Sequence, residues 1–261
     1  FKLDDGLHMN WPSRFYYSGW WAEPGGMVAN ENYDETITEL NRIFEEAQVY
    51  AAGTPALTDL KKEALKGLFD GQKTLYIHAD GAKEMIQAVR FAKSHGVQKV
   101  VLVGAAESYK IIDFLKEESI PVILQRVHEL PSAADEDIDL PFRLPAMLHE
   151  AGILVAINYA GDMERMGSRN LPFTAGTAAG YGMTKEEALQ LITLNVAKIM
   201  GIDQYVGSLE VGKYATFFVS EGDALDMRGN QVTDAWIQGK KLDLSNHQKA
   251  LYERYKKKLG L

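Results

Sequence analysis

Short, continuously apolar runs alternate with helical patterns over the middle of the chain. After each run, apolar side chains recur three or four positions apart, as they do on one face of a helix. Strands that are apolar throughout and separated by helices are typical of a parallel sheet buried on both faces. The predicted strands are residues 74–78, 99–103, 120–124 and 153–157, and the predicted helices between them are residues 80–96, 109–118 and 144–151.

Two further helices are predicted upstream, at residues 34–50 and 57–69, each with a single apolar stripe. Residues 1–34 show neither a helical nor a strand period, but they are rich in aromatic residues and turn formers. We interpret residues 1–34 as a loop-rich cover that packs through its aromatic rings. An aromatic wall that grips a ligand is the alternative interpretation.

Downstream, residues 169–202 have a helix-turn-helix pattern in which Thr184 is placed to cap a second helix that runs to Gly201. The apolar run at residues 217–219 and the alternating run at residues 231–238 predict strands of a second sheet. Ser245 is placed to cap a charged terminal helix.

Composition narrows the class of protein. Hydrophobic residues make up 46% and charged residues 25% of the 261 residues, which is ordinary for a soluble globular protein. The net charge of −8 argues against a nucleic-acid partner, which would require clustered positive charge. We interpret the cluster of Lys256, Lys257 and Lys258 as a solvated helix end. No apolar run is long enough to cross a membrane.

The absence of cysteine excludes disulfides, thiolate metal sites and cysteine nucleophiles. The chain starts at Phe1 without a leader pattern, so either a segment has been removed or the chain is part of a longer protein. Cytosolic and oxidising compartments both fit the composition. We favour an extracytoplasmic, periplasmic location over a cytoplasmic one.

The order of motifs after residue 170 resembles a known superfamily. The segments LPF, AG and YG are followed by EEAL, IT, AK and GI, and then by VGSLEVGK, all at fixed spacing. This order resembles the C-terminal signature of the amidohydrolase superfamily, in its imidazolonepropionase-like branch. One departure is Tyr214-Ala215-Thr216, where the family usually has Asp-Ala-Asp. The resemblance extends more weakly over residues 75–243.

The resemblance also decides between two architectures. Four β-α units fit either an open doubly wound sheet or half of an eight-stranded barrel. By resemblance, the expected fold is α/β: the C-terminal half of a TIM-type (β/α)8 amidohydrolase barrel plus part of a small β-sandwich. The missing N-terminal half would come from another segment or from a second copy, because proteins avoid open sheet edges. The expected divisions are a cover (1–34), a partial barrel (35–204), a sandwich segment (205–242) and a C-terminal helix (243–261).

Candidate chemistry lies where the predicted strands end, because ligands gather at the carboxyl ends of parallel strands. His78 stands at such an end, either as a loop histidine or, as the resemblance implies, as a ligand of a divalent metal. By the same resemblance, the next strand should end in a second metal-binding histidine, but Gly104 and Ala105 stand there. Glu107 is either an inward-reaching acid or an exposed acid at a helix start.

The last predicted strand is irregular in a similar way. The family has an aspartate directly after this strand, which activates the attacking water, whereas here the nearest carboxylate is the displaced Asp162. Asp162 is the expected catalytic base, and Asn158, Tyr159 and Asn170 are the expected substrate-binding residues. The family's His-x-His pair is not found in this sequence, and His8 and His128 are isolated in it.

The segment 176–180 has glycines and alanines at helix-packing spacing, which favours close helix contact over a phosphate-binding loop. Two functions remain. The first is a metal-dependent hydrolase, with zinc as the expected metal, that acts on a carbon–nitrogen bond of a small-molecule substrate such as an amide or cyclic amide. The second is a pseudoenzyme that has lost the metal and serves as a binding or assembly subunit.

Overall fold

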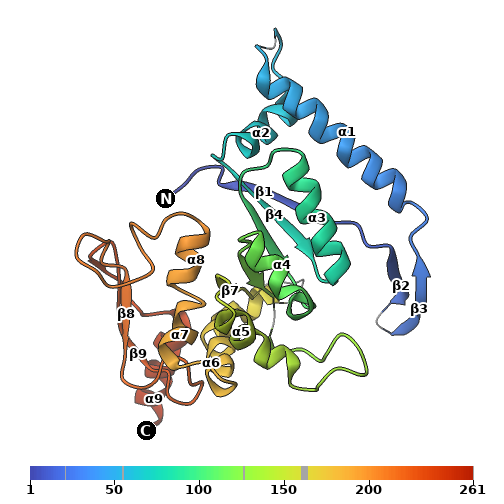
Figure 1. Ribbon diagram of the computed structural model, residues 1–261. Coiled ribbons are helices and arrows are strands. Elements are labelled where there is room, and N and C mark those ends of the chain that lie inside the picture. Colours follow the sequence, from blue (N-terminus) through green and yellow to red (C-terminus); the bar gives the residue numbers. More distant parts are fainter. Residues whose placement is uncertain (21, 55, 126, 160–163, 261) are drawn as a thin grey trace.

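The computed structural model describes residues 1–20, 22–54, 56–125, 127–159 and 164–260. Its centre is a five-stranded sheet in the order β1-β4-β5-β6-β7, and all four neighbouring pairs are parallel (Figure 1). The strands are β1 (Gly6–Asn10), β4 (Thr74–Ala79), β5 (Val100–Gly104), β6 (Val122–Leu124) and β7 (Val155–Ile157). The four strands predicted from apolar runs are therefore present.

The two faces of this sheet have different neighbours. One face packs against helices and contains the largest group of buried side chains, among them Leu75, Ile77 and Leu102. The helices are α3 (Ala82–Ser94), α4 (Ile112–Glu117), α5 (Leu140–Glu150) and α6 (Leu171–Gly180). The other face, which we call the inner face, carries Tyr76, Val101 and Val103 and packs against Val196 and Ile199 of helix α8. Burial on both faces explains why the strands are apolar throughout.

The loop-rich cover predicted for residues 1–34 is wrong in its secondary structure. Besides β1, the segment forms the antiparallel hairpin of β2 (Phe15–Trp20) and β3 (Glu23–Ala29). Of its aromatic rings, Trp11 packs inward against Phe91 as predicted, whereas Phe15, Tyr16, Tyr17 and Trp20 are all more than half exposed. The period of β1 is masked by polar residues on its inner face, and the hairpin buries too little to show an alternating pattern.

The upstream helices are confirmed as α1 (Tyr33–Ala52) and α2 (Leu60–Phe69). Between β5 and β6, a short 3-10 helix, η1 (Ser108–Ile111), precedes α4. Beyond β7, a second 3-10 helix, η2 (Glu164–Asn170), leads into α6. Gly176 of α6 lies so close to the chain at Leu225 that an added Cβ would be 2.2 Å from the Leu225 carbonyl oxygen. Tight helix packing, rather than a phosphate loop, accounts for this glycine.

The helix predicted to run from Thr184 to Gly201 is divided into α7 (Lys185–Gln190) and α8 (Leu194–Ile199). The division occurs where residues of this segment form hydrogen bonds with strand β7. The Ile157 N–H donates to the Leu191 carbonyl at 3.1 Å, and the Asn195 side-chain amide donates to the Val155 carbonyl at 2.8 Å. Bonds to the sheet therefore replace a continuous helical ladder at this point.

Thr184 caps α7 as expected, and Glu187 completes a reciprocal capping box. We expect Thr184→Ala to lower the free energy of unfolding by about 1 kcal/mol, because it leaves a backbone donor in the first turn without its partner. Thermal or urea denaturation would measure this loss. A Thr184→Ser variant keeps the hydroxyl and should stay within about 0.5 kcal/mol of the parent chain; a loss equal to that of alanine would contradict the capping role.

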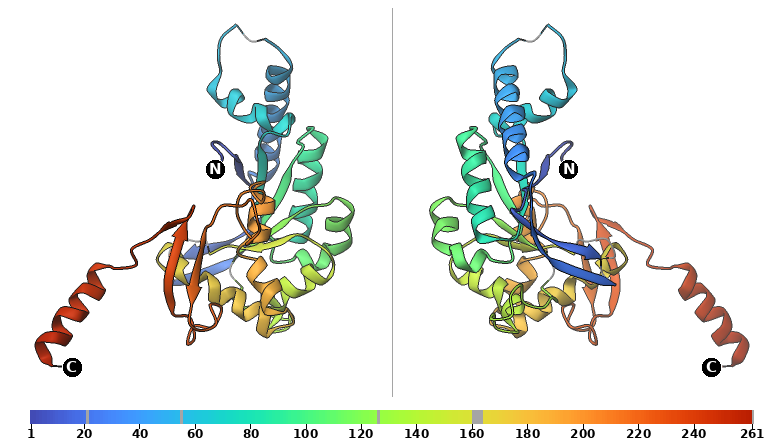
Figure 2. Two further views of the ribbon diagram at one scale, coloured as in Figure 1. Left: turned by 90° about the vertical axis from the view of Figure 1, so that its left-hand side faces the viewer. Right: turned by 90° about the vertical axis from the view of Figure 1, so that its right-hand side faces the viewer.

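The chain ends in a small second sheet and a helix. Strands β8 (Phe217–Ser220), β9 (Val232–Ile237) and β10 (Lys240–Lys241) form an antiparallel sheet in the order β10-β9-β8. Helix α9 (His247–Leu259) projects away from the rest of the molecule (Figure 2). Asn246, rather than the predicted Ser245, caps it, because the Ser245 hydroxyl is engaged with Asp243. Among the described residues, no helix combines the length and apolar character that crossing a membrane requires.

Candidate functional site

The carboxyl ends of the five parallel strands meet at one edge of the sheet. The register aligns one row of residues across the inner face near this edge: Asn10, His78, Val103, Ile123 and Ala156. His78 is therefore the second residue of this row, after Asn10, and the row becomes apolar on β5, β6 and β7. The row shows that Val103, rather than Gly104, is the inner-face neighbour of His78 on the next strand.

His78 forms a pair with His8 of the adjacent strand. His8 Nδ1 and His78 Nε2 are 2.8 Å apart, a hydrogen-bond distance at which one ring donates to the other. The His8 ring stacks on Tyr76 with 4.8 Å between ring centroids, and the Tyr76 hydroxyl donates to Asp5 at 2.7 Å. The interpretation of His8 as an isolated histidine is therefore wrong. Its partner lies 70 residues away in sequence, so only the parallel pairing of β1 with β4 brings the rings together.

The environment of His78 favours a neutral imidazole. Burial lowers the pKa of His78, and the neighbouring His8 lowers it further, while the negative charge of Asp80 acts in the opposite direction. A neutral ring nitrogen is the form that binds a metal or accepts a proton. The His8–His78 pair is thus the described feature of the inner face with the clearest capacity for chemistry.

Asp80 and Gly104 lie at the ends of neighbouring strands, and the Asp80 side chain packs against the backbone of Gly104. An added Cβ on Gly104 would lie 2.5 Å from Asp80 Oδ1, and Gly104 has a φ of +95°. The Ala106 N–H donates to the Asp80 side chain, and burial raises the pKa of this carboxyl. Gly81, rather than Asp80, is the N-cap of α3. The carboxylate of Asp80 therefore takes the space that a side chain at position 104 would need.

Glu107 does not reach the inner face. Its carboxylate accepts from the Ala82 N–H at 2.8 Å, in the first turn of α3, and pairs with Lys110 at 2.6 Å. The hydrogen bonds and charges of these partners hold the pKa of Glu107 below its usual value, against the opposing effect of burial. Of the two interpretations considered for Glu107, the acid at a helix start agrees with the structure.

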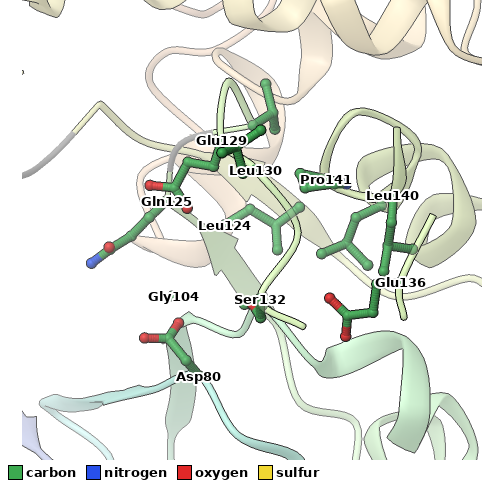
Figure 3. A pocket seen from close by; sticks show the side chains of 13 residues that line it. Asp80, Gly104, Leu124, Gln125, Glu129, Leu130, Ser132, Glu136, Leu140 and Pro141 are labelled. Carbon is green, nitrogen blue, oxygen red and sulfur yellow. The ribbon is translucent and has the colours of Figure 1, made fainter. Parts of the chain in front are cut away.

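A cavity of about 270 Å³ lies over the ends of β4, β5 and β6, beneath the loop that follows β6 (Figure 3). Its wall combines apolar side chains with carboxylates and polar groups. Glu136 is already engaged, since it accepts from the Tyr109 hydroxyl at 2.7 Å. The lining residues are Asp80, Gly104, Ala106, Leu124, Gln125, Val127, Glu129, Leu130, Ser132, Glu136, Leu140, Pro141 and Leu144.

The predicted substrate-binding residues have different surroundings. Asn158 follows β7 directly, its N–H donates to the Leu124 carbonyl at 2.9 Å, and its buried Oδ1 finds no hydrogen-bond partner among the described residues. Tyr159 packs over Gly167 of η2, where an added Cβ would be 2.8 Å from its ring. Asn170 precedes α6 without capping it through its side chain. Asp162, the predicted base, lies outside the described residues.

The remaining histidines mostly have structural partners. His128 Nε2 lies 2.6 Å from Thr177 Oγ1 and ties the loop after β6 to α6, so it is not isolated as the sequence suggested. Burial lowers the pKa of His128. His95 is buried at the end of α3 with its Nδ1 2.9 Å from the Phe91 carbonyl.

Comparison with known proteins identifies the family to which this chain belongs. The sequence profile described as "Amidohydrolase family" matches residues 27–242. The chain belongs to the amidohydrolase family. Members of this family typically use a divalent metal. In the part of the chain that the structure describes, no group of three or more histidine, cysteine, aspartate or glutamate side chains could hold a metal ion.

Two curated relatives of this amidohydrolase-family chain are imidazolonepropionases. The protein of Erwinia tasmaniensis is 30% identical over 161 residues, which are 62% of this chain and 32% of the relative. The protein of Shewanella frigidimarina is 33% identical over 105 residues, which are 40% of this chain and 20% of the relative. The matched part thus spans a third or less of either relative.

Solved structures show the same fold. An amidohydrolase from Thermotoga maritima superposes with a TM-score of 0.72 at 24% identity, covering 91% of this chain and 62% of that one. Phenylurea hydrolase B gives a TM-score of 0.52 at 17% identity, covering 79% and 56% of the two chains. The expected fold class, the C-terminal half of an amidohydrolase barrel with part of a sandwich, is therefore confirmed. Strand β1 adds a fifth strand to the four expected.

Proposed function

We propose that this chain supplies the C-terminal half of the active-site barrel of a metal-dependent hydrolase that acts on a carbon–nitrogen bond, such as that of an amide or cyclic amide. Family membership and the imidazolonepropionase relatives support the reaction class. The observation that carries the proposal is the 2.8 Å pair of His8 and His78 on the inner face. His78 lies near the carboxyl end of β4, where barrel enzymes bind substrate, and His8 reaches it from the middle of β1.

The pair suits part of a metal site. Two nitrogens bound to one tetrahedral zinc at about 2.0–2.1 Å lie roughly 3.3 Å apart, so a small rotation of either ring would let both bind. Zinc takes three or four protein ligands. The other ligands would come from the N-terminal half of the barrel, supplied by another segment. When bound, such a metal lowers the pKa of its water and polarises the scissile group.

The other residues of this chain would bind and orient the substrate. Asn158 Oδ1 is buried without a partner among the described residues, so it can accept an N–H from an amide substrate. Tyr159 and Asn170 lie on the segment that follows Asn158, at opposite ends of the stretch that contains Asp162. We propose Asp162 as the base that takes a proton from the attacking water.

A catalytically inactive subunit that binds a ligand or assembles with a partner is the second candidate. The register favours it, because the row containing His78 continues as Val103, Ile123 and Ala156, none of which binds a metal. Asp80 also leaves no room for a side chain at position 104. In this alternative, the cavity beneath the loop after β6 would bind a small molecule without hydrolysing it.

Metal analysis distinguishes the two candidates. If the first is correct, the purified protein together with the segment that supplies the N-terminal half should contain close to one equivalent of zinc or a similar ion, and His78→Ala should reduce the metal content about tenfold or more. His149→Ala is the matched control, because His149 lies on α5, where its ring pairs with Glu187 at 3.3 Å. A folded protein without metal, or one that keeps its metal after His78→Ala, would rule out the first candidate as stated.

A further inference from the structure

Helix α9 presents an apolar stripe that the rest of the chain leaves uncovered. None of its residues is buried, and Tyr252, Tyr255 and Leu259 are 63%, 52% and 67% exposed. At 100° per residue, Leu251, Tyr252, Tyr255 and Leu259 fall within one third of the helix surface. A stripe of this width is typical of a helix that packs against another surface.

The rest of the helix surface is strongly basic. Lys249, Arg254, Lys256, Lys257 and Lys258 stand against the single acid Glu253, so α9 has a net charge of +4. Because the whole chain carries −8, the remainder carries −12. This contrast in charge favours an acidic protein surface, of the kind found on this chain, as the binding partner of α9. It disfavours a membrane of anionic lipids, because such a surface would repel the rest of the molecule.

The hairpin of β2 and β3 offers an exposed apolar surface with an acidic border, which matches the apolar stripe and the positive charge of α9. On one face of the hairpin, Phe15, Tyr17 and Met27 are 55%, 72% and 59% exposed, while Tyr16 lies on the opposite face. Exposed apolar patches of this kind mark interaction sites. Acidic residues border the patch, namely Glu23 on β3, Glu31 in the connection to α1, and Asp34 and Glu35 in the first turn of α1. The nearby cation, Arg14, lies over the Tyr33 ring.

We propose that α9 of one molecule docks on the β2–β3 hairpin of a second copy of this chain, with its apolar stripe on the aromatic patch and its lysines beside the acidic border. Figure 1 places the hairpin at one side of the molecule and α9 at the opposite side, so α9 in its observed position does not reach the hairpin of its own chain. Reciprocal exchange of α9 between two copies closes a dimer with two-fold symmetry.

Cysteine pairing tests the contact directly. The chain contains no native cysteine, so only the engineered cysteines can form disulfides, and a mass tag on one variant distinguishes the mixed disulfide from a disulfide between two copies of the same variant. A mixture of Tyr17→Cys and tagged Tyr252→Cys should form the mixed species, with the summed mass of the two chains, under mild oxidation. A mixture of Lys116→Cys and Tyr252→Cys is the control, since Lys116 is exposed on α4, and should form at least about tenfold less. Equal cross-linking in both mixtures would overturn the proposal.

The oligomeric state provides the second test. The parent chain should sediment as a dimer at micromolar concentration, and the triple variant K256E/K257E/K258E should raise the dissociation constant about tenfold or more. The control K61E/K83E/K116E makes the same change in net charge at exposed lysines on α2, α3 and α4 and should leave the constant within about twofold. A monomeric parent chain would overturn the proposal. So would binding to anionic phosphatidylserine vesicles through α9 without dimerisation.

Discussion

Gly104→Ala is expected to lower the free energy of unfolding by about 2–4 kcal/mol, which combines backbone strain with overpacking. Gly104 has a φ of +95°, a backbone angle that residues other than glycine rarely adopt. A Cβ added at this position would lie 2.5 Å from Asp80 Oδ1. The Asp80 carboxylate is held in place by the Ala106 N–H, so it cannot move aside without losing that bond. Urea denaturation of the purified variant would measure the loss.

Two controls separate the causes. Gly152 has a similar φ of +83° with nothing within 4 Å of an added Cβ, so Gly152→Ala should cost only the strain, about 1–2 kcal/mol. In the double variant of Gly104→Ala and Asp80→Gly, the second change removes the side chain that the new Cβ would meet, so the two losses should be less than additive. Additive losses would show that Asp80 and Gly104 do not constrain one another.

Gly176→Ala is expected to destabilise the fold by about 2–3 kcal/mol, although alanine is the better helix former. The added Cβ would lie 2.2 Å from the Leu225 carbonyl oxygen, and a backbone atom cannot rotate away as a side chain can. Helix α6 or the segment 221–230 would have to shift. Thermal unfolding of the variant would measure the effect.

The matched control is in the same helix. Gly180 has nothing within 4 Å of an added Cβ, so Gly180→Ala should be neutral or stabilise the protein by up to about 0.5–1 kcal/mol. If Gly176→Ala were as well tolerated as Gly180→Ala, close packing between α6 and the chain at Leu225 would not be the reason for glycine at position 176.

The pattern of apolar residues was sufficient to predict the centre of the sheet, because β4 to β7 are buried on both faces and their sequences show it. It failed for β1, whose inner-face residues His8 and Asn10 are polar and whose neighbour β4 lies far along the chain. It also missed the division between α7 and α8, since this depends on hydrogen bonds from β7 to Leu191 and from Asn195 to β7. Such tertiary bonds leave no periodic signal.

The candidate site was predictable only in part, for a related reason. His78 could be identified from its place at the end of an apolar run. Its partner His8 could not, because pairing across parallel strands depends on register rather than on spacing in the sequence. The register shows that Val103, rather than Gly104, is the inner-face neighbour of His78 on the next strand. The role of Gly104 depends on Asp80, which lies against it on the neighbouring strand end.

The pairing of β1 with β4 also has a consequence for how the sheet assembles. Strands β4, β5, β6 and β7 follow one another along the chain with a single connection between each pair, whereas β1 is joined to β4 through the hairpin and helices α1 and α2. Closing this loop of about 60 residues costs roughly 1 kcal/mol more free energy, through lost chain entropy, than closing the loop of about 20 residues between β4 and β5. Since short loops close at lower cost, the β4–β5 unit is the cheaper nucleus and β1 the more expensive addition. His8 therefore reaches His78 only at the end of the costlier closure, and any chemistry of the pair depends on that step.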